Sequence, residues 1–471
     1  MILLWFPICL ALPTISGWLL IRLIEGAHPV LMRAERWILG FLFGVTGTMY
    51  LTFLLHIAGA VAFTRVGFAA VQVILTFVLG CSWYARRKKI DDVRPQTHTP
   101  EQPLSRKART ICGCIGLWMG AKILAGFLML TTTPVYWDDV FNNWNMRGKI
   151  FFLEHKLSLI SLSGNEEVVT GGTHSYPPTV PMVKAWLALL AGRWNEGLVN
   201  TVHIVWYLAA LGLAYCFLRR TTSRRTALIG TYLLGSIPLF LVHGSNPYAD
   251  VFVAAHIFAA TGLLASALSA HTNPQRRTFL KLTAVACALL MFTKNEGLVL
   301  HLPPLLLLAG LSLVWMRRKS FLTHREVLHA AAWFVGCVGV VGIPWVTFKW
   351  MHHLPFGNAK SLSGLTFAWQ EHVLYAISVN TFFEGNWLFL YPILMGLMVA
   401  CWRRAFRTPA IIFSAFFLMI YLGQLPLFLF TGLSTEVILQ TGYARGLIQL
   451  APVAVTLLAI LAEDLVRRKK I

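Results

Sequence analysis

Residues 249–269 read ADVFVAAHIFAATGLLASALS, an apolar run with one acidic residue near its start and no Lys or Arg. A helix of roughly 17 to 25 apolar residues crosses a hydrocarbon core about 30 Å thick. Similar runs recur from Ile2 to Val466 with short polar interruptions, and we count about thirteen. The sequence therefore predicts an all-α polytopic membrane protein with about thirteen transmembrane helices and further helices lying in the membrane interface.

The composition excludes a water-soluble globule. Hydrophobic residues make up 57% of the chain and charged residues 13%, whereas soluble domains carry roughly 25% charged residues. The first apolar run, near residues 3–24, has no basic residue ahead of it and no small-residue cleavage site before Arg22. It differs from a signal peptide in both respects, so we expect it to stay in the mature chain.

The net charge of +21 comes from short basic runs at the ends of apolar spans rather than from one patch. This distribution is typical of positive-inside topology and does not favour nucleic-acid binding. It predicts an outer N-terminus and a cytoplasmic C-terminus. The runs are Arg86 to Lys89, Arg219 with Arg220, Arg224 with Arg225, Arg276 with Arg277, Arg317 to Lys319, Arg403 with Arg404, and Arg467 to Lys470.

Three regions are predicted along the chain. Residues 1–85 form an N-terminal three-helix membrane extension, and the charged, Pro-containing stretch 86–109 is a cytoplasmic linker. Residues 110–471 form the main transmembrane module, which holds the largest outer loop, residues 132–196. We expect the working part of the protein in this third region.

The outer loop opens with Tyr136 to Lys149, where Asp138 and Asp139 are two of only six Asp in the chain. Carboxylates are costly to hold near hydrocarbon, so a pair of them there indicates a functional site. The alternative is an N-cap, in which an Asp accepts backbone N–H bonds at a helix start.

Helical periodicity places Asp138, Asn142, Asn145 and Lys149 on one face of an interfacial helix. A second surface helix is expected at residues 183–191, and another interfacial helix around residues 365–378.

Further polar groups lie in short turns that face outward by parity of the spans. They include Asn246 and Asp250 before one span, Lys294 and Glu296 between two others, and Arg445 in the last outer loop. Because these turns share one side of the membrane, we expect them to line one cavity with the Asp138 loop. Asp250 alone is also explained as a helix cap, and Lys294 as an interfacial lysine.

No cofactor is firmly predicted. The eight Cys are scattered, nearly all within apolar spans, and so form neither a disulfide framework nor a metal site. The pair His352 and His353 has no acidic partner nearby in sequence and is better explained as interfacial polarity. Participation of a divalent metal is left open.

The order of motifs resembles the GT-C class of integral-membrane glycosyltransferases, in particular bacterial relatives of protein O-mannosyltransferases and aminoarabinose transferases. The resemblance covers roughly residues 111 to 470. It rests on four places, namely Trp137 to Asp139, Tyr176 to Pro178, Asn246 to Asp250, and Lys294 to Gly297.

This resemblance implies transfer of a sugar from a polyprenyl-phosphate carrier to a hydroxyl of a glycan, lipid or protein. The reaction would take place on the extracytoplasmic side of the inner membrane, among membrane lipids, and usually with inversion. A carboxylate accepts the hydroxyl proton, while cations stabilise the departing phosphate.

The resemblance places the acidic pair on Asp138 and Asp139, with Asp138 as the preferred base. Lys294, beside Glu296, and Arg445 are the candidate phosphate cations. Arg147 and Lys149 are weaker candidates that also suit lipid headgroups. His174 and Tyr176 stand where some relatives carry a phosphate-binding Lys, and Asn246 with Asp250 would shape the cavity.

Two other classes of protein compete with this hypothesis. A multi-pass transporter or flippase of a lipid-linked saccharide would bury charges near the membrane midplane, whereas the polar groups here gather in outer loops. A structural subunit with a degenerate site is the third possibility. Replacing Asp138 and Asp139 by Asn separates them, because only an enzyme must lose transfer while inserting normally.

Overall fold

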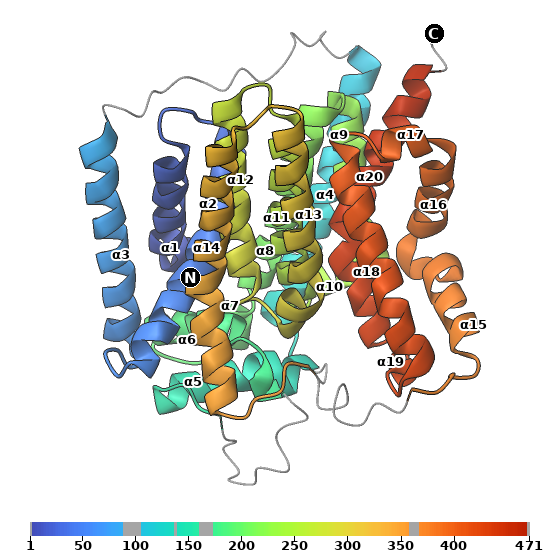
Figure 1. The fold of residues 1–471 in the computed structure, drawn as a ribbon. Helices are drawn as coiled ribbons and strands as arrows, with labels where there is room; N and C mark the ends of the chain where they lie inside the picture. The colour runs from blue at the N-terminus through green and yellow to red at the C-terminus, as the bar shows by residue number, and fades with distance from the viewer. Residues whose placement is uncertain (1, 88–104, 136–138, 160–172, 358–366, 469–471) are drawn as a thin grey trace.

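The computed structural model describes residues 2–87, 105–135, 139–159, 173–357 and 367–468. Within these ranges every regular element is a helix, and the long helices lie side by side in one bundle (Figure 1). The prediction of an all-α membrane protein is confirmed.

Ten helical segments among the described residues are long and apolar enough to cross a membrane. They are α1 (Ile2–Glu25), α2 (Arg33–Ile57), α3 (Arg65–Arg86), α4 (Arg106–Thr132), α7 (Glu196–Val199) with α8 (Val202–Thr221), α11 (Asp250–Ser269), η4 (Gly297–His301) with α13 (Leu302–Arg318), α14 (His324–Met351), α18 (Ala410–Phe430) and α20 (Gly442–Arg468).

The predicted count of thirteen spans is not confirmed, and three expected spans account for the difference. α9 (Arg224–Leu234) and α10 (Pro238–Gly244) are bent by 72° at a break before the proline and make an eleventh span only if joined. α12 (Asn273–Leu290) has a polar first half, and α16 (Leu390–Ala400) has only 11 residues.

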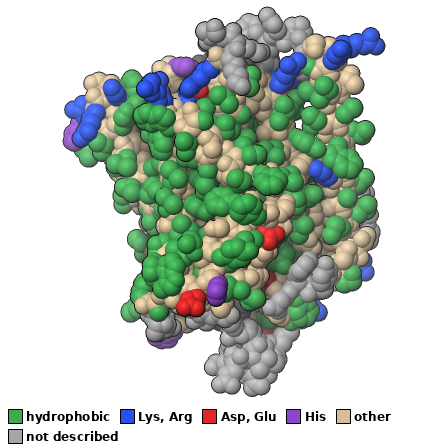
Figure 2. Space-filling model, turned by 90° about the vertical axis from the view of Figure 1, so that its right-hand side faces the viewer, with side chains coloured by type: hydrophobic (Ala, Val, Ile, Leu, Met, Phe, Trp, Pro, Cys, Tyr) green, Lys and Arg blue, Asp and Glu red, His purple; other side chains and the backbone are tan. Residues whose placement is uncertain are grey.

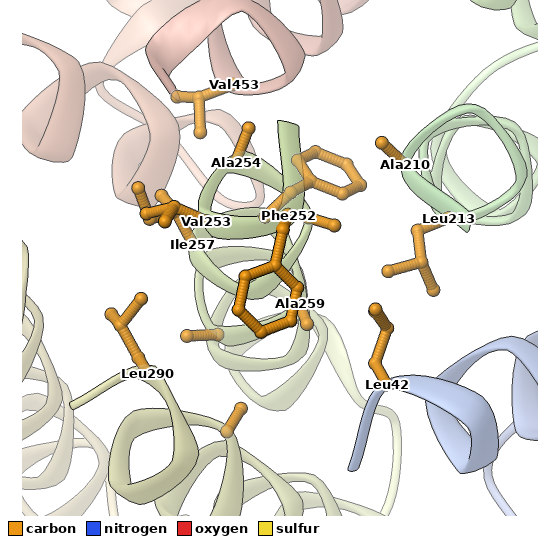
Figure 3. Close-up of a cluster of buried hydrophobic side chains, with 14 of the residues drawn as sticks. Leu42, Ala210, Leu213, Phe252, Val253, Ala254, Ile257, Ala259, Leu290 and Val453 are labelled. Atoms are coloured by element: carbon orange, nitrogen blue, oxygen red, sulfur yellow. The ribbon is translucent and has the colours of Figure 1, made fainter. Parts of the chain in front are cut away.

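Helix α11, which contains the apolar run quoted above, occupies the centre of the bundle. Each of residues 250–268 is buried. Its side chains meet four other helices, α2, α8, α12 and α20, through Leu42, Leu213, Leu290 and Val453 (Figure 3). Alanines at 254, 255, 259 and 260 allow the neighbours to approach closely. The first residue of α11, Asp250, is thereby fixed in place.

Helices α1 and α2 pack backbone to backbone through three glycines. A Cβ at Gly44 would overlap the carbonyl oxygen of Pro13, and one at Gly17 would overlap that of Gly40. Close approach at small residues is a common way for membrane helices to associate. α2 also contacts α6 and α8, so the N-terminal helices adjoin the main bundle. The predicted domain boundaries remain a prediction, and most of the linker 86–109 lies outside the described residues.

The outer loop folds into a π-helical turn, η2 (Val140–Asn145), followed by α5 (Met146–Glu154), η3 (Thr173–Ser175) and α6 (Thr179–Ala191). Of the predicted polar face, Asn142 and Lys149 are exposed but Asn145 is buried. A π turn carries more residues than an α turn, so it shifts the register on which the face was predicted. The second predicted helix exists as α6, but it is buried against α5 and α7 instead of lying at the surface.

Short elements complete the described chain. The predicted interfacial helix at 365–378 corresponds to α15 (Val373–Ser378), and its first two residues lie outside the described ranges. The others are η5 (Val379–Phe383), η6 (Gly385–Trp387), α17 (Trp402–Ala405) and α19 (Ser434–Ile438).

Candidate active site

The carboxylate of Asp250 is the centre of a buried polar cluster. Lys294 Nζ lies 3.0 Å from its Oδ1, and Gln449 Nε2 donates to the same oxygen at 3.0 Å. His243 Nδ1 lies 3.3 Å from Oδ2, and Arg445 Nε lies 3.6 Å from it. The Asp250 side chain is 1% exposed. Its partners are thus side chains of other elements, which an ordinary helix cap does not require.

Four separate parts of the fold deliver these groups. His243 belongs to α10, Asp250 begins α11, and Lys294 lies in the turn between α12 and η4. Arg445 and Gln449 are four residues apart on α20 and therefore share one helix face. The cluster depends on tertiary packing around α11.

Lys294 is held by two carboxylates. Besides Asp250, Glu296 Oε1 lies 3.1 Å from its Nζ, and the ring of Tyr176 has its centroid 5.6 Å away. Burial by itself would lower the pKa of Lys294, but Asp250 and Glu296 outweigh it and raise that pKa above its usual range. Lys294 is therefore a permanent cation.

Arg445 joins the outer loop to the cluster. Its Nη2 forms an ion pair with Asp139, and its guanidinium lies 5.4 Å from the ring centroid of Tyr248. Asp139 stands at the start of η2 but makes no side-chain capping hydrogen bond, so the N-cap alternative is not realised there. Asp138, the preferred base, lies outside the described residues.

The Tyr176 turn packs against Lys294. The Tyr176 ring has the ring of Trp144 5.5 Å away, and burial together with nearby carboxylates raises the pKa of its phenol. Arg147 Nη2 donates to the carbonyl oxygen of Tyr176 at 3.0 Å, and its Nη1 donates to Asn143 Oδ1 at 3.3 Å. Burial lowers the pKa of Arg147 to about 9, partly opposed by Tyr176. Arg147 therefore clamps this turn and is too buried to bind lipid headgroups.

Three predicted site residues stay outside the cluster as far as the described contacts go. Lys149 is exposed on α5. Asn246 Nδ2 donates to the carbonyl oxygen of Val242 at 2.9 Å and so closes the end of α10. His174 is buried beside Arg147, and burial followed by the nearby Arg147 charge lowers its pKa to about 4. His174 is thus neutral at pH 7.

Sequence reasoning missed two polar residues that support the site. Gln449 Oε1 lies 2.8 Å from His301 Nε2, so this amide links Asp250 to a third helix. Lys349, at the end of α14, donates from Nζ to the carbonyl oxygen of Ser175 at 2.6 Å and to Asn295 Oδ1 at 3.1 Å. The sequence does contain one signal that could have identified Gln449, which is its position four residues after Arg445 within an apolar span.

Among the Asp, Glu, Lys and Arg side chains of the described cluster, carboxylates outnumber cations. Three carboxylates, those of Asp139, Asp250 and Glu296, face two cations, Lys294 and Arg445. Within the described ranges, no three His, Cys, Asp or Glu side chains lie close enough together to hold a metal ion. The arrangement offers cations for a bound anion and a carboxylate beside them.

Comparison with known proteins places the fold. No family model and no curated protein matches the sequence. Two solved structures share the helical bundle, so the fold that the resemblance implies is confirmed.

Both structures are of ArnT from Cupriavidus metallidurans. The apo structure has a TM-score of 0.52 and 16% identity over 77% of this chain and 62% of that chain. The structure bound to undecaprenyl phosphate has a TM-score of 0.54 and 16% identity over 75% and 60%. The chain thus spans less than two thirds of the length of the ArnT structures that it matches.

Proposed function

We propose that this chain is a membrane glycosyltransferase that moves a sugar from a polyprenyl-phosphate carrier to a hydroxyl of a glycan, lipid or protein. One observation carries the proposal. Carboxylates and cations from the outer loop, α11, the α12–η4 turn and α20 converge at one end of a bundle that has the ArnT fold. One of the two ArnT structures is bound to undecaprenyl phosphate, which suits a phosphate-binding cluster of this kind.

The carboxylates and the cations of the site have separate roles in the proposed reaction. A carboxylate of the Asp138–Asp139 pair accepts the proton of the acceptor hydroxyl as its oxygen bonds to the anomeric carbon. The bond from that carbon to the phosphate oxygen breaks, and its electron pair leaves with the polyprenyl phosphate. Lys294 and Arg445 stabilise the phosphate. Attack from the face opposite the leaving group inverts the anomeric configuration.

Asp250 serves this chemistry by orienting the cations. Its side chain is 1% exposed and contacts both Lys294 and Arg445. A carboxylate that is buried and held by two cations is a weak proton acceptor. The more exposed Asp139, with its side chain 42% exposed, can meet an incoming hydroxyl.

The topology supports an extracytoplasmic site in an inner membrane. α11 runs away from Asp250, and α12, which begins near Arg276 and Arg277, returns to Lys294. The cluster and these arginines therefore lie at opposite ends of the bundle. In Figure 2 most of the visible Lys and Arg side chains lie at the top, above a broad hydrophobic band. By the positive-inside rule that end is the cytoplasmic one, which supports an outer position for the cluster.

The test compares surface glycans by mass spectrometry in cells that carry the gene, lack it, or carry an Asp138→Asn/Asp139→Asn double variant. We expect one sugar increment to disappear in the last two. Asp464→Asn is the matched control, because Asp464 is ion-paired with Arg468 at the far end of α20. Transfer that persists in a correctly inserted double variant contradicts the proposal and favours a transporter of a lipid-linked saccharide.

A further inference from the structure

Arg445 lies between two carboxylates that differ in their burial and in their other partners. It pairs with Asp139 of the outer loop and lies 3.6 Å from Asp250 of α11. Asp250 is buried and keeps Lys294, Gln449 and His243 as partners if Arg445 moves. The Asp139 side chain is 42% exposed, so water can solvate its carboxylate when the guanidinium leaves. Breaking the Arg445–Asp139 ion pair therefore costs less free energy than breaking the contact between Arg445 and Asp250.

The charge of the cluster decides what a bound phosphate must do. Among the Asp, Glu, Lys and Arg side chains of the cluster, three carboxylates already face two cations, so an added phosphate finds no Lys or Arg there that is not already paired with a carboxylate. It has to take a cation from a carboxylate. Lys294 is the poorer choice, because it is 3% exposed and fixed between Asp250 and Glu296. The guanidinium of Arg445 is 24% exposed and can bind a phosphate through two N–H groups.

We infer that Arg445 is shared between Asp139 and the donor phosphate. Without donor it pairs with Asp139, and with donor bound it turns to the phosphate and releases the Asp139 carboxylate. This inference rests on the proposed function. It makes donor binding the event that frees a carboxylate at the place where the acceptor hydroxyl arrives, so the donor binds first.

The effect of neutralising Asp139 on phosphate affinity distinguishes competition for Arg445 from a purely structural role of Asp139. If Asp139 competes with phosphate for Arg445, neutralising Asp139 strengthens phosphate binding. If Asp139 only holds η2 against α20, neutralising it leaves binding unchanged or weakens it. Only the competition therefore predicts tighter phosphate binding when Asp139 is neutralised.

The experiment measures the affinity of undecaprenyl phosphate for the full-length protein in lipid nanodiscs. We expect Asp139→Asn to bind about two- to fivefold more tightly than wild type, the range of an exposed ion pair. Arg445→Gln should bind about tenfold more weakly, because a charged contact with the phosphate is lost. The Asp139→Asn/Arg445→Gln protein should bind no more tightly than Arg445→Gln.

Two further variants separate charge from packing. Asp139→Glu keeps the charge and should keep wild-type affinity, and Asp464→Asn removes a distant ion-paired carboxylate without effect. If Arg445→Gln weakens binding but Asp139→Asn does not strengthen it, the sharing of Arg445 is overturned and the proposed function stands. If wild type does not bind undecaprenyl phosphate, the proposed function and this inference both fail.

Discussion

Lys294 Nζ and Asp250 Oδ1 are 3.0 Å apart, and the two side chains are only 3% and 1% exposed. Neither charge is stable alone at such a depth, because burial without a partner removes its hydration. The pair also joins the turn after α12 to the first residue of α11. The cluster therefore stabilises the packing of these elements as well as forming a candidate site.

Removing one member of this pair should destabilise the protein more than removing both. We expect Lys294→Met and Asp250→Leu each to cost about 3 kcal/mol of unfolding free energy. The double variant should cost clearly less than the sum, since neither buried charge of the pair is left without the other, and Glu296, whose side chain is 35% exposed, can be solvated by water. Thermal unfolding of the four proteins in one detergent measures this coupling. Additive losses would show that the two charges do not depend on each other.

Lys349 gives a second prediction, about the turn that carries Tyr176. Its ammonium donates to Ser175 and Asn295 and lies 5.2 Å from the ring centroid of Trp345. We expect Lys349→Met to lower the apparent melting temperature and to raise the KM for a polyprenyl-phosphate donor, because the turn loses a buried donor.

Lys281→Met is the matched control for Lys349, because Lys281 is exposed on α12. It should change neither the melting temperature nor the KM. Equal effects of the two substitutions would show that Lys349 acts only through general loss of charge.

The sequence predicts the spans well wherever one apolar helix runs unbroken, as in α11. It fails at Pro238, where a break bends α9 against α10, and at α12, whose arginines and Lys281 interrupt the apolar run. Such breaks are decided by tertiary packing, which supplies partners for charges and freed backbone groups. Periodicity within one segment carries no record of those partners.

Parity alone was enough to group most of the charged residues of the site. Alternating spans place the turns at Asp250, Lys294 and Arg445 on one side, and the structure brings these three together. Parity does not say which side chains touch. Gln449 and Lys349 belong to apolar spans, where an isolated polar residue has several equally good explanations until its neighbours are known.

His174 predicts how stability depends on pH. Its pKa is about 4 in the folded protein, below the usual 6.5, because it is buried near Arg147. Between those values the unfolded chain binds more protons, so stability falls as the pH drops from about 6.5 toward about 4. The apparent melting temperature should fall less steeply over this range in His174→Gln than in wild type.

The control for this pH profile is His28→Gln, because His28 is exposed in the loop between α1 and α2. Its profile should follow that of wild type. Parallel profiles for wild type and His174→Gln would contradict the assignment of this acid sensitivity to His174.

The glycine contact between α1 and α2 gives the last prediction. Gly44 faces the backbone of Pro13, and a methyl group there has no room unless the two helices separate. Because the obstacle is backbone, no side-chain rotation relieves it, and we expect Gly44→Ala to cost about 1 to 3 kcal/mol, the range of overpacked sites. Gly113 on α4 has open space where the methyl group of an alanine would lie, so Gly113→Ala should be neutral or slightly stabilising, as helix propensity favours Ala. Thermal unfolding of both variants decides the matter: if Gly44→Ala melts with Gly113→Ala, the two N-terminal helices do not depend on this contact.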